Sequence, residues 1–233
     1  RRTVVGWASG LDMGRSVPDS AEGIAGQKGR VVNLGLETGT AAPALVAALR
    51  PQAAAARLWA ERTLGKGDAA FAPGDTSGDV YLLLQGLVRL VYTTETGEAW
   101  IKSFIIDCGV FSGRGAADRG NDSYGAECVE PCRFVRLPRA FVAEAVARDA
   151  GVRAAYDAFQ AWVLSRKQAR EAAQLTLTPE ARLRALLSAA PDIAARLPQG
   201  DIARFIGVTP VAFSRIKRRI AQSGSISPSD RRA

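Results

Sequence analysis

The C-terminal part of the chain contains the sequence QGDIARFIGVTPVAFSRIKRRI at residues 199–220. Residues 199–206 predict a short helix, and Gly207-Val208 predicts a tight turn after it. The pair Thr209-Pro210 is typical of a helix start, because Thr accepts a hydrogen bond from a free backbone N–H and Pro suits the first helical turn. We therefore expect a second helix from Val211 to about Ile220.

Apolar residues in this stretch are spaced so that they lock the two helices together: Ala203, Val208, Phe213 and Ile216. The same spacing leaves polar and basic residues facing outward: Ser214, Arg215, Arg218 and Arg219. Two short helices joined by a glycine turn, the second of them basic, are typical of a helix-turn-helix, whose second helix enters a major groove about 12 Å wide. An ordinary helical hairpin is the alternative interpretation.

The charge of the chain is unevenly distributed. Its 233 residues carry a net charge of +8, of which residues 178–233 hold +6 from ten basic and four acidic side chains. Residues 1–177 therefore carry only +2. A nearly neutral body with a basic C-terminal module predicts a polyanionic partner for that module, although charge alone equally allows a solvated basic surface.

The absence of histidine excludes several classes of function. A Ser-His-Asp triad, a His general base, and zinc or haem held by His all require an imidazole. The strand region also lacks converging carboxylates, so we expect neither an enzyme nor a cofactor. The three cysteines Cys108, Cys128 and Cys132 suit a structural role in a reducing cytoplasm, with a redox or metal pair at Cys128 and Cys132 as the alternative.

The N-terminal region gives no targeting signal. No run of 18 apolar residues occurs in the chain, so no transmembrane helix or membrane partner is expected. The N-terminus lacks the residue order of a secretory signal, which favours a cytoplasmic location. Residues 1–12 precede the only Met, so we expect them to be either upstream translation or the open end of a fragment. The fold prediction does not include them. Residues 1–40 predict a mobile leader.

The middle of the chain predicts a β domain followed by helices. Residues 41–62 predict one or two short helices broken before Pro51. Short apolar runs then predict strands in a small sandwich or barrel, at residues 80–84, 87–92, 100–105 and 133–137. From Arg139 the spacing becomes helical, with an apolar stripe at Val152, Tyr156, Phe159 and Val163. That stripe allows either packing back on the β domain or a dimer seam.

These residues resemble the Crp/Fnr family of bacterial transcription regulators. The DNA-binding signature of that family is similar to residues 199–216, and its β-roll is similar to Pro73-Gly74-Asp75, residues 80–90, Gly97 and Cys108-Gly109-x-Phe111. The resemblance implies an α+β fold with an N-terminal antiparallel β-roll (jelly roll), a long dimerisation helix and a C-terminal winged helix-turn-helix. The implied parts are a leader (1–40), a sensor β-roll with flanking helices (41–148), the dimerisation helix (149–176) and the DNA-binding domain (177–233).

The resemblance also implies a homodimer that binds double-stranded DNA and contacts RNA polymerase. It favours a dimer seam formed by Val152, Tyr156, Phe159, Val163 and Ala173. The implied DNA contacts come from Gln199, Thr209, Pro210, Val211, Ser214, Arg215, Lys217, Arg218 and Arg219. Arg215 falls on the family's guanine-reading Arg, whereas Val211 replaces a common Glu, so the half-site should differ from the usual one. The wing after residues 226–228 is expected to be short.

The residues that match the family's cyclic-nucleotide pocket are degenerate. Family members that bind cyclic nucleotides use Phe-x-Gly-Glu and Arg-Ser, where this chain has Phe111-Ser112-Gly113-Arg114 and Asp122-Ser123. Both charges are inverted, and an Asp that faces a phosphate is repelled at a cost of about a few kcal/mol. We therefore expect no response to cyclic AMP, and the effector is unknown. The alternative function is a small-molecule or cyclic-nucleotide sensor whose C-terminal domain contacts protein instead of DNA.

Overall fold

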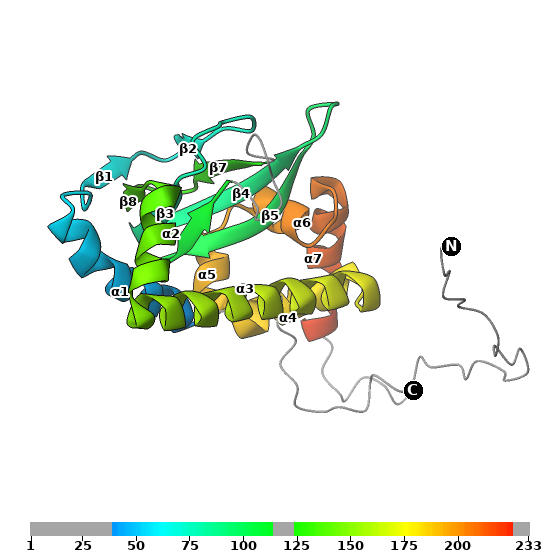
Figure 1. Cartoon of the computed structure of the whole chain (residues 1–233). Helices are drawn as coiled ribbons and strands as arrows, with labels where there is room; N and C mark the ends of the chain where they lie inside the picture. The colour runs from blue at the N-terminus through cyan, green and yellow to red at the C-terminus, as the bar shows by residue number, and fades with distance from the viewer. Residues whose placement is uncertain (1–38, 114–123, 226–233) are drawn as a thin grey trace, which may run out of the picture. The chain divides into compact units, whose positions relative to one another are not determined.

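The computed structural model of the protein describes residues 39–113 and 124–225. Within these residues the chain runs from one helix through a set of strands to a series of helices (Figure 1). The elements are α1 (Ala41–Ala55), β1 (Glu61–Leu64), β2 (Ala69–Phe71), β3 (Val80–Gln85), β4 (Leu87–Thr93), β5 (Ala99–Ile106), β6 (Val110–Ser112), β7 (Gly125–Cys128), β8 (Cys132–Leu137), α2 (Arg139–Arg148), α3 (Ala150–Thr176), α4 (Pro179–Ala189), α5 (Pro191–Arg196), α6 (Gln199–Phe205) and α7 (Pro210–Ser225).

The strands form two antiparallel sheets with the orders β1-β8-β3-β6 and β2-β7-β4-β5. Aromatic side chains from both sheets meet in the core between them, among them Phe71, Tyr81, Phe111 and Phe134. The predicted β-roll and the α+β class are therefore confirmed.

Strand β3 shows why its sequence is apolar without interruption. Tyr81 and Leu83 point into the core between the sheets, while Leu82 points the other way into a cluster with α1. A strand that is covered on both faces needs apolar residues at successive positions, because neighbouring side chains point to opposite faces. The sheet that contains β3 thus lies between the second sheet on one side and the helices on the other.

The turn between β3 and β4 requires glycine. Gly86 has a φ of +113°, and a Cβ at this position would lie 2.7 Å from the Cys132 sulfur and 2.8 Å from the Pro131 carbonyl oxygen. The Gly86 N–H donates a hydrogen bond of 2.6 Å to the Asp107 carboxylate. The turn therefore brings β3, β5 and the loop before β8 into close contact.

The expected break before Pro51 is wrong, because α1 continues through this residue. Proline removes one helical hydrogen bond and costs about 3 kcal/mol in a helix interior. Leu45, Leu49 and Ala53 on the inner face of α1 are buried in the cluster with β3 and α3. Full burial of each leucine contributes about 1.5–3 kcal/mol, which offsets the cost of the proline.

Helix α3 packs its apolar stripe inside the protomer. The stripe residues Val152, Tyr156, Phe159 and Val163 lie in the cluster with α1 and the first sheet, and Ala173 lies in the cluster of the C-terminal helices. The five residues predicted as a dimer seam thus pack within the protomer, which is the other alternative that the pattern allowed. The opposite face of α3 is exposed and carries Ala154, Ala158, Ala161, Leu164, Ser165, Gln168, Ala172 and Leu175.

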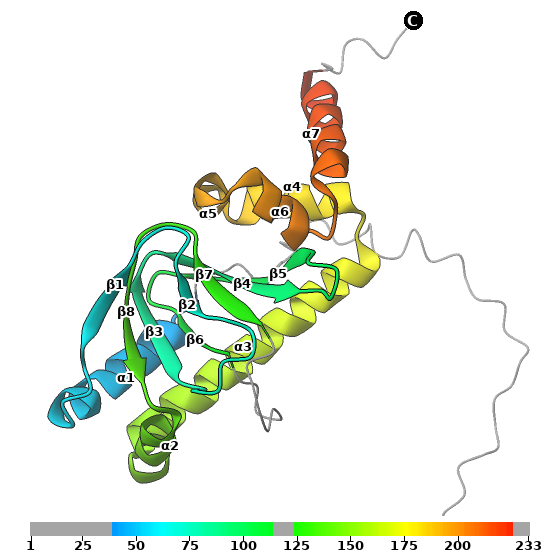
Figure 2. The ribbon, with the colours of Figure 1, turned by 90° about the horizontal axis from the view of Figure 1, so that it is seen from above.

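The C-terminal helices share one apolar cluster with the second sheet. Leu183, Ile202 and Phe213 of these helices belong to the same buried cluster as Leu87 and Phe104 of the β-roll. Figure 2 shows α6 beside β5. Several predictions fall outside the described residues: the leader up to residue 38, Arg114, Asp122, Ser123 and the wing at residues 226–228.

Candidate nucleic-acid interface

The turn and the cap before α7 fix where this helix begins. Gly207 has a φ of +78°, a conformation that glycine adopts without a steric cost. The Thr209 hydroxyl accepts a hydrogen bond of 3.3 Å from the Ala212 N–H, and Pro210 is the first residue of α7. The cap satisfies a free N–H at the N-terminus, so the first turn of α7 is held in a defined position.

The two faces of α7 differ sharply in burial. Phe213 and Ile216 are buried against the other C-terminal helices. The opposite face exposes Val211, Ser214, Arg215, Lys217 and Arg218, and the Val211 side chain is 64% exposed. The Ser214 hydroxyl donates to the Pro210 carbonyl at 3.1 Å and keeps its acceptor capacity. This face therefore offers two arginines and an apolar side chain to a partner.

Three arginines of the C-terminal region serve the fold itself. Arg182 is 6% exposed and donates to the backbone carbonyls of Ile206, Leu177 and Gln174 at 2.9, 2.7 and 3.1 Å. It thereby satisfies carbonyls at the ends of α3 and α6. Arg204 lies 3.6 Å from Asp201, and Arg196 binds carboxylates of the β-roll.

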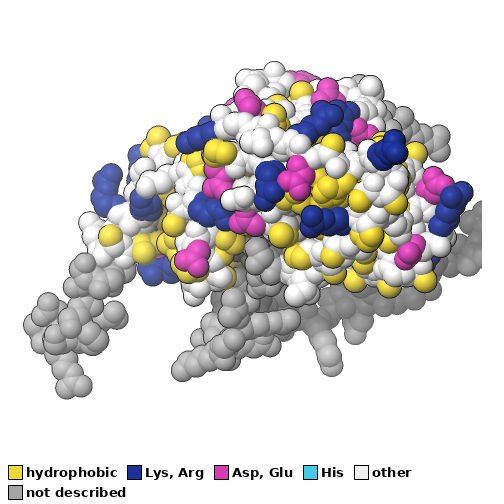
Figure 3. All heavy atoms as spheres, turned by 90° about the vertical axis from the view of Figure 1, so that its left-hand side faces the viewer, with side chains coloured by type: hydrophobic (Ala, Val, Ile, Leu, Met, Phe, Trp, Pro, Cys, Tyr) yellow, Lys and Arg dark blue, Asp and Glu magenta, His cyan; other side chains and the backbone are white. Residues whose placement is uncertain are grey.

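The remaining basic side chains that the structure describes in this region lie on α4 and α7. Arg184 and Arg219 both reach Glu180, and the Lys217 ammonium donates to the Gln199 side-chain oxygen at 2.9 Å. Arg215 and Arg218 are exposed and have no ion-pair partner within the described residues. On the side that carries α1 and β1, by contrast, basic and acidic side chains are interspersed (Figure 3). Within the described residues, α7 therefore presents two exposed arginines that form no ion pair.

A buried ion pair holds α6 against the β-roll. The Asp201 carboxylate is 2% exposed and accepts two hydrogen bonds from one Arg89 nitrogen, at 2.9 and 2.8 Å. Arg89 of β4 also donates to Glu127 of β7 at 2.9 and 2.6 Å. The sequence did not predict this contact, although Asp201 stands directly before the apolar pair Ile202-Ala203, where a buried carboxylate needs a partner.

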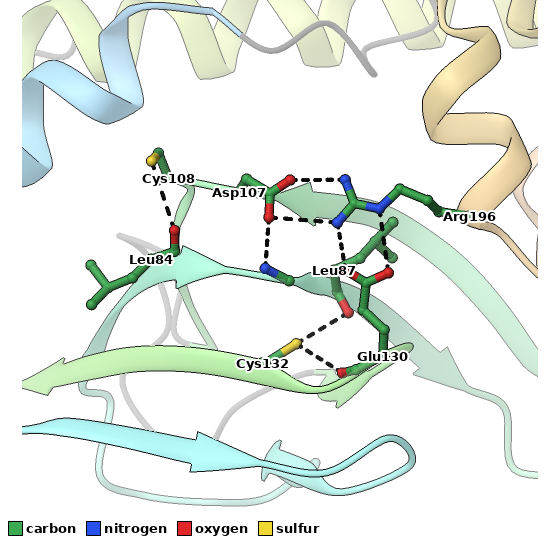
Figure 4. Close-up of polar contacts among 8 residues, drawn as sticks. Leu84, Leu87, Asp107, Cys108, Glu130, Cys132 and Arg196 are labelled. Carbon is green, nitrogen blue, oxygen red and sulfur yellow. Dashed lines mark hydrogen bonds and ion pairs between the residues drawn. The ribbon is translucent and has the colours of Figure 1, made fainter.

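A second ionic contact joins α5 to the β-roll, as Figure 4 shows. Arg196 donates to Asp107 at 2.8 Å and to Glu130 at 2.5 Å. Partial burial raises the pKa of Asp107, but hydrogen bonds from Arg196 and Gly86 lower it by more. The pKa of Asp107 therefore lies below its usual range. Asp107 is therefore charged at neutral pH, and the contact is formed under those conditions.

Two of the cysteines lie in the core. Cys128 and Cys132 are buried, and burial raises the pKa of both thiols, that of Cys128 to about 12. The Cys132 thiol donates to the carbonyls of Leu87 and Glu130 at 3.4 and 3.2 Å (Figure 4). Protonated buried thiols are poor nucleophiles and poor metal ligands, so their arrangement favours a packing role.

The described residues of the predicted effector pocket are engaged within the chain. Phe111 is buried and stacks on Tyr81 with 5.1 Å between ring centroids. The Ser112 hydroxyl accepts a hydrogen bond of 3.1 Å from Arg139, and its carbonyl accepts one from the Tyr124 hydroxyl. Arg139 thus reaches this pocket. The two pocket motifs gave no sign of it, because Arg139 lies at the start of α2, 27 residues after Ser112.

Comparisons with known proteins agree with this arrangement. Residues 61–149 match the family model of the cyclic nucleotide-binding domain. The chain is 26% identical to the nitrogen fixation regulation protein FixK of Azorhizobium caulinodans over 196 residues. This match covers 78% of each of the two chains. FixK2 of Bradyrhizobium japonicum has a similar structure, with a TM-score of 0.59, 19% identity and coverage of 75% of this chain and 90% of its own.

A second solved structure gives the same fold. It is the cyclic-di-GMP-responsive global regulator CLP of Xanthomonas campestris, with a TM-score of 0.63, 13% identity and coverage of 77% of this chain and 93% of its own. A sensor β-roll, a long helix and a C-terminal helix-turn-helix define a class of transcription regulators. The chain contains a match to the cyclic nucleotide-binding domain and is similar to regulators of the Crp/Fnr type.

None of the helices in residues 39–113 and 124–225 is both long and apolar enough to cross a membrane.

Proposed function

We propose that the chain is a homodimeric, sequence-specific DNA-binding regulator that uses α7 as its recognition helix and does not respond to cyclic AMP. The observation that carries this proposal is the exposed face of α7. Arg215 and Arg218 are unpaired there among the described residues, whereas Arg182, Arg196 and Arg204 are engaged inside the molecule.

Arg215 is the proposed base-reading residue. It lies more than one turn into α7, on the face opposite the buried Phe213 and Ile216. A bidentate Arg contact to guanine discriminates against other bases by about 1–3 kcal/mol. Val211, in the first turn, offers an apolar contact that suits a thymine methyl group. Lys217, Arg218 and Arg219 are proposed to neutralise phosphates, and Gln199, Thr209, Pro210 and Ser214 to contribute further contacts.

The first test compares Arg215→Ala with Arg148→Ala, an exposed arginine of α2 in the β-roll half of the chain. An operator is first selected from random DNA with the full chain, and affinities are then measured for the operator and for unrelated DNA. Arg215→Ala should weaken operator binding by about 1–3 kcal/mol per half-site and change binding to unrelated DNA far less. Arg148→Ala should change neither. Equal weakening on both DNAs would contradict base reading by Arg215.

Salt dependence separates DNA binding from the alternative of a sensor whose C-terminal domain contacts protein. If three side chains of each protomer neutralise phosphates, a dimer covers about six, and the slope of log affinity against log salt is roughly −5. Arg218→Ala should reduce that slope by about 2, because each dimer loses two contacts. Lack of DNA binding at low salt would favour the sensor with a protein partner.

The proposed lack of response to cyclic AMP has two grounds. The charges of the two pocket motifs are inverted, and the Ser112 hydroxyl already accepts a hydrogen bond from Arg139. Addition of cyclic AMP should leave operator affinity unchanged, and a large gain would contradict this part of the proposal. Contact with RNA polymerase stays a prediction.

A further inference from the structure

The side chains of Gln199 and Lys217 connect the two helices of the helix-turn-helix at its surface. Gln199 is the first residue of α6, and Lys217 lies about two turns into α7. The Lys217 ammonium donates a hydrogen bond of 2.9 Å to the Gln199 side-chain oxygen, and both residues are exposed. Lys217 follows the buried Ile216 directly and lies one helical turn after the buried Phe213. It therefore stands at the border of the exposed face of α7, on the side of α6.

This hydrogen bond is not needed to hold α6 and α7 together. Phe205 of α6 and Phe213 and Ile216 of α7 already lie in one buried apolar cluster. A hydrogen bond at an exposed surface contributes little to stability, because water offers the same groups equivalent partners. The contact between Gln199 and Lys217 therefore serves mainly to place the Lys217 ammonium.

Lys217 differs from the neighbouring basic side chains in the kind of partner that holds it. On the surface of α4 and α7, Arg184 and Arg219 face the carboxylate of Glu180 at 3.0 and 3.5 Å. A carboxylate offsets the charge of the side chain that it fixes. The Gln199 amide fixes Lys217 but carries no charge, so the full positive charge of the ammonium stays available to a partner.

The groups that this pair leaves free are hydrogen-bond donors. An ammonium can only donate, so the Gln199 amide must turn its oxygen toward Lys217 and its N–H groups away. Neither these N–H groups nor the remaining ones of the ammonium have another hydrogen-bond partner within residues 39–113 and 124–225. Adjacent donors with a positive charge suit an anion with several acceptor oxygens, such as a phosphate of the DNA backbone.

The place of the pair in the fold also indicates a backbone phosphate. In a helix-turn-helix, the second helix lies in the major groove and the first helix crosses the sugar-phosphate backbone. Val211 and Arg215 lie on the outer face of α7, which would meet the bases, whereas Lys217 lies at the border toward α6. A pair of side chains that joins both helices at this border would meet the strand that both helices approach.

We propose that Gln199 and Lys217 form a clamp for one backbone phosphate, in which Lys217 supplies the charge and Gln199 is a positioning residue that fixes Lys217 before DNA binds. Fixing a long side chain in advance reduces the conformational entropy that it loses on binding. The clamp also sets where α7 stands along the groove, because one phosphate is held from both helices. This inference rests on the proposed function and adds a role for Gln199 that acts through Lys217.

The role of Gln199 is tested by a double-mutant cycle on operator affinity, with variants of the full chain that circular dichroism shows to be folded. Lys217→Met should weaken operator binding by at least about tenfold and reduce the salt slope by about 2, because each dimer loses two phosphate contacts. Gln199→Met should weaken binding by about fivefold at an unchanged slope, because Lys217 keeps its charge but must be ordered on binding. In the Lys217→Met background, Gln199→Met should change the affinity by less than about twofold.

Arg218→Ala provides the matched control for this cycle. Arg218 is the neighbouring exposed basic residue of α7, is proposed to bind a different phosphate, and forms no ion pair among the described residues. Gln199→Met should therefore weaken binding by the same factor of about five in the Arg218→Ala background as in the original chain. If Gln199→Met weakens binding equally with and without Lys217, the clamp is overturned while the proposed function stands.

A second experiment identifies the phosphate itself. The phosphates of one half-site are replaced one at a time by uncharged methylphosphonate, and the affinity for each altered operator is measured. At one position the original chain and Arg218→Ala should lose affinity by the same factor, Gln199→Met by a smaller factor, and Lys217→Met not at all. If Lys217→Met keeps the original sensitivity at every position, the clamp is overturned. A chain that binds no DNA at low salt would overturn the proposed function together with the clamp.

Discussion

Arginine serves two opposite purposes in the C-terminal helices. Arg182 is buried and satisfies backbone carbonyls, whereas Arg215 is exposed and unpaired among the described residues. A count of charges along the sequence treats both alike, so the net +6 of residues 178–233 overstates the charge available to DNA. Helical spacing could place Arg215 opposite Phe213 because that relation is local. The position of Arg182 depends on where α3 and α6 end, which no local pattern contains.

Two glycines with a positive φ allow a matched test of the β3–β4 turn. Gly86 and Gly97 have φ values of +113° and +82°, but a Cβ on Gly97 would meet nothing within 4 Å. Gly97→Ala should therefore cost only the backbone strain of about 1–2 kcal/mol. Gly86→Ala adds the overlap with Cys132 and Pro131 and should cost about 3 kcal/mol or more. Urea denaturation of the two variants measures the difference. Equal losses would mean that the loop before β8 gives way at little cost.

At the scale of elements, the sequence predicted the longer apolar strands and missed the short ones, β1, β2, β6 and β7. The apolar runs of β3, β4, β5 and β8 were recognisable because a covered strand needs apolar residues. β1 has three exposed residues out of four, and β2 and β6 have three residues each, too few for a periodic pattern. Their pairing depends on neighbours that are distant in the sequence, such as Glu61 with Val135.

Helix α3 has two faces that could each pack against another element, and its sequence alone does not show which partner each face takes. The strongest apolar stripe packs inside the protomer, and the exposed face carries Ala158, Ala161, Ser165, Gln168, Ala172 and Leu175 at alternating spacings of three and four residues. Such spacing is typical of a helix that pairs with another helix, and small residues allow close approach. We expect the family's dimer contact on this exposed face.

The dimer contact is tested by Leu175→Glu, a residue of α3 that is 80% exposed. The introduced carboxylate would face its copy across a two-fold axis, so the dissociation constant of the dimer should rise by at least about tenfold, equal to about 1.4 kcal/mol. Sedimentation equilibrium measures the change. The control, Arg153→Glu, reverses a charge on an exposed position of α3 outside the alternating set and should leave the dimer intact. An unchanged dimer in the Leu175 variant would place the contact elsewhere.

At the scale of the whole described chain, ionic contacts fix the helix-turn-helix to the β-roll. Arg89 with Asp201 and Arg196 with Asp107 and Glu130 all join a C-terminal helix to the β-roll. Asp201 is buried, so its contact is shielded from salt, whereas Arg196 and its partners are partly exposed. A change in β5 or in the loop before β8 therefore reaches α5 and α6 directly.

Asp201→Asn tests whether the buried pair holds α6 on the β-roll. Asparagine keeps the size of the side chain but loses its charge, and its amide group would face the Arg89 guanidinium. Arg89 keeps Glu127 as a partner, so the loss should be about 2 kcal/mol, smaller than for a charge left wholly unpaired. Amides of α6 should then exchange hydrogen about 30-fold faster, which mass spectrometry of the full chain measures. Asp192→Asn, an exposed carboxylate of α5, should leave this exchange unchanged. If α6 exchanges at the original rate in the Asp201 variant, the apolar contacts around Phe104 and Phe205 hold the helix-turn-helix in place without the ion pair.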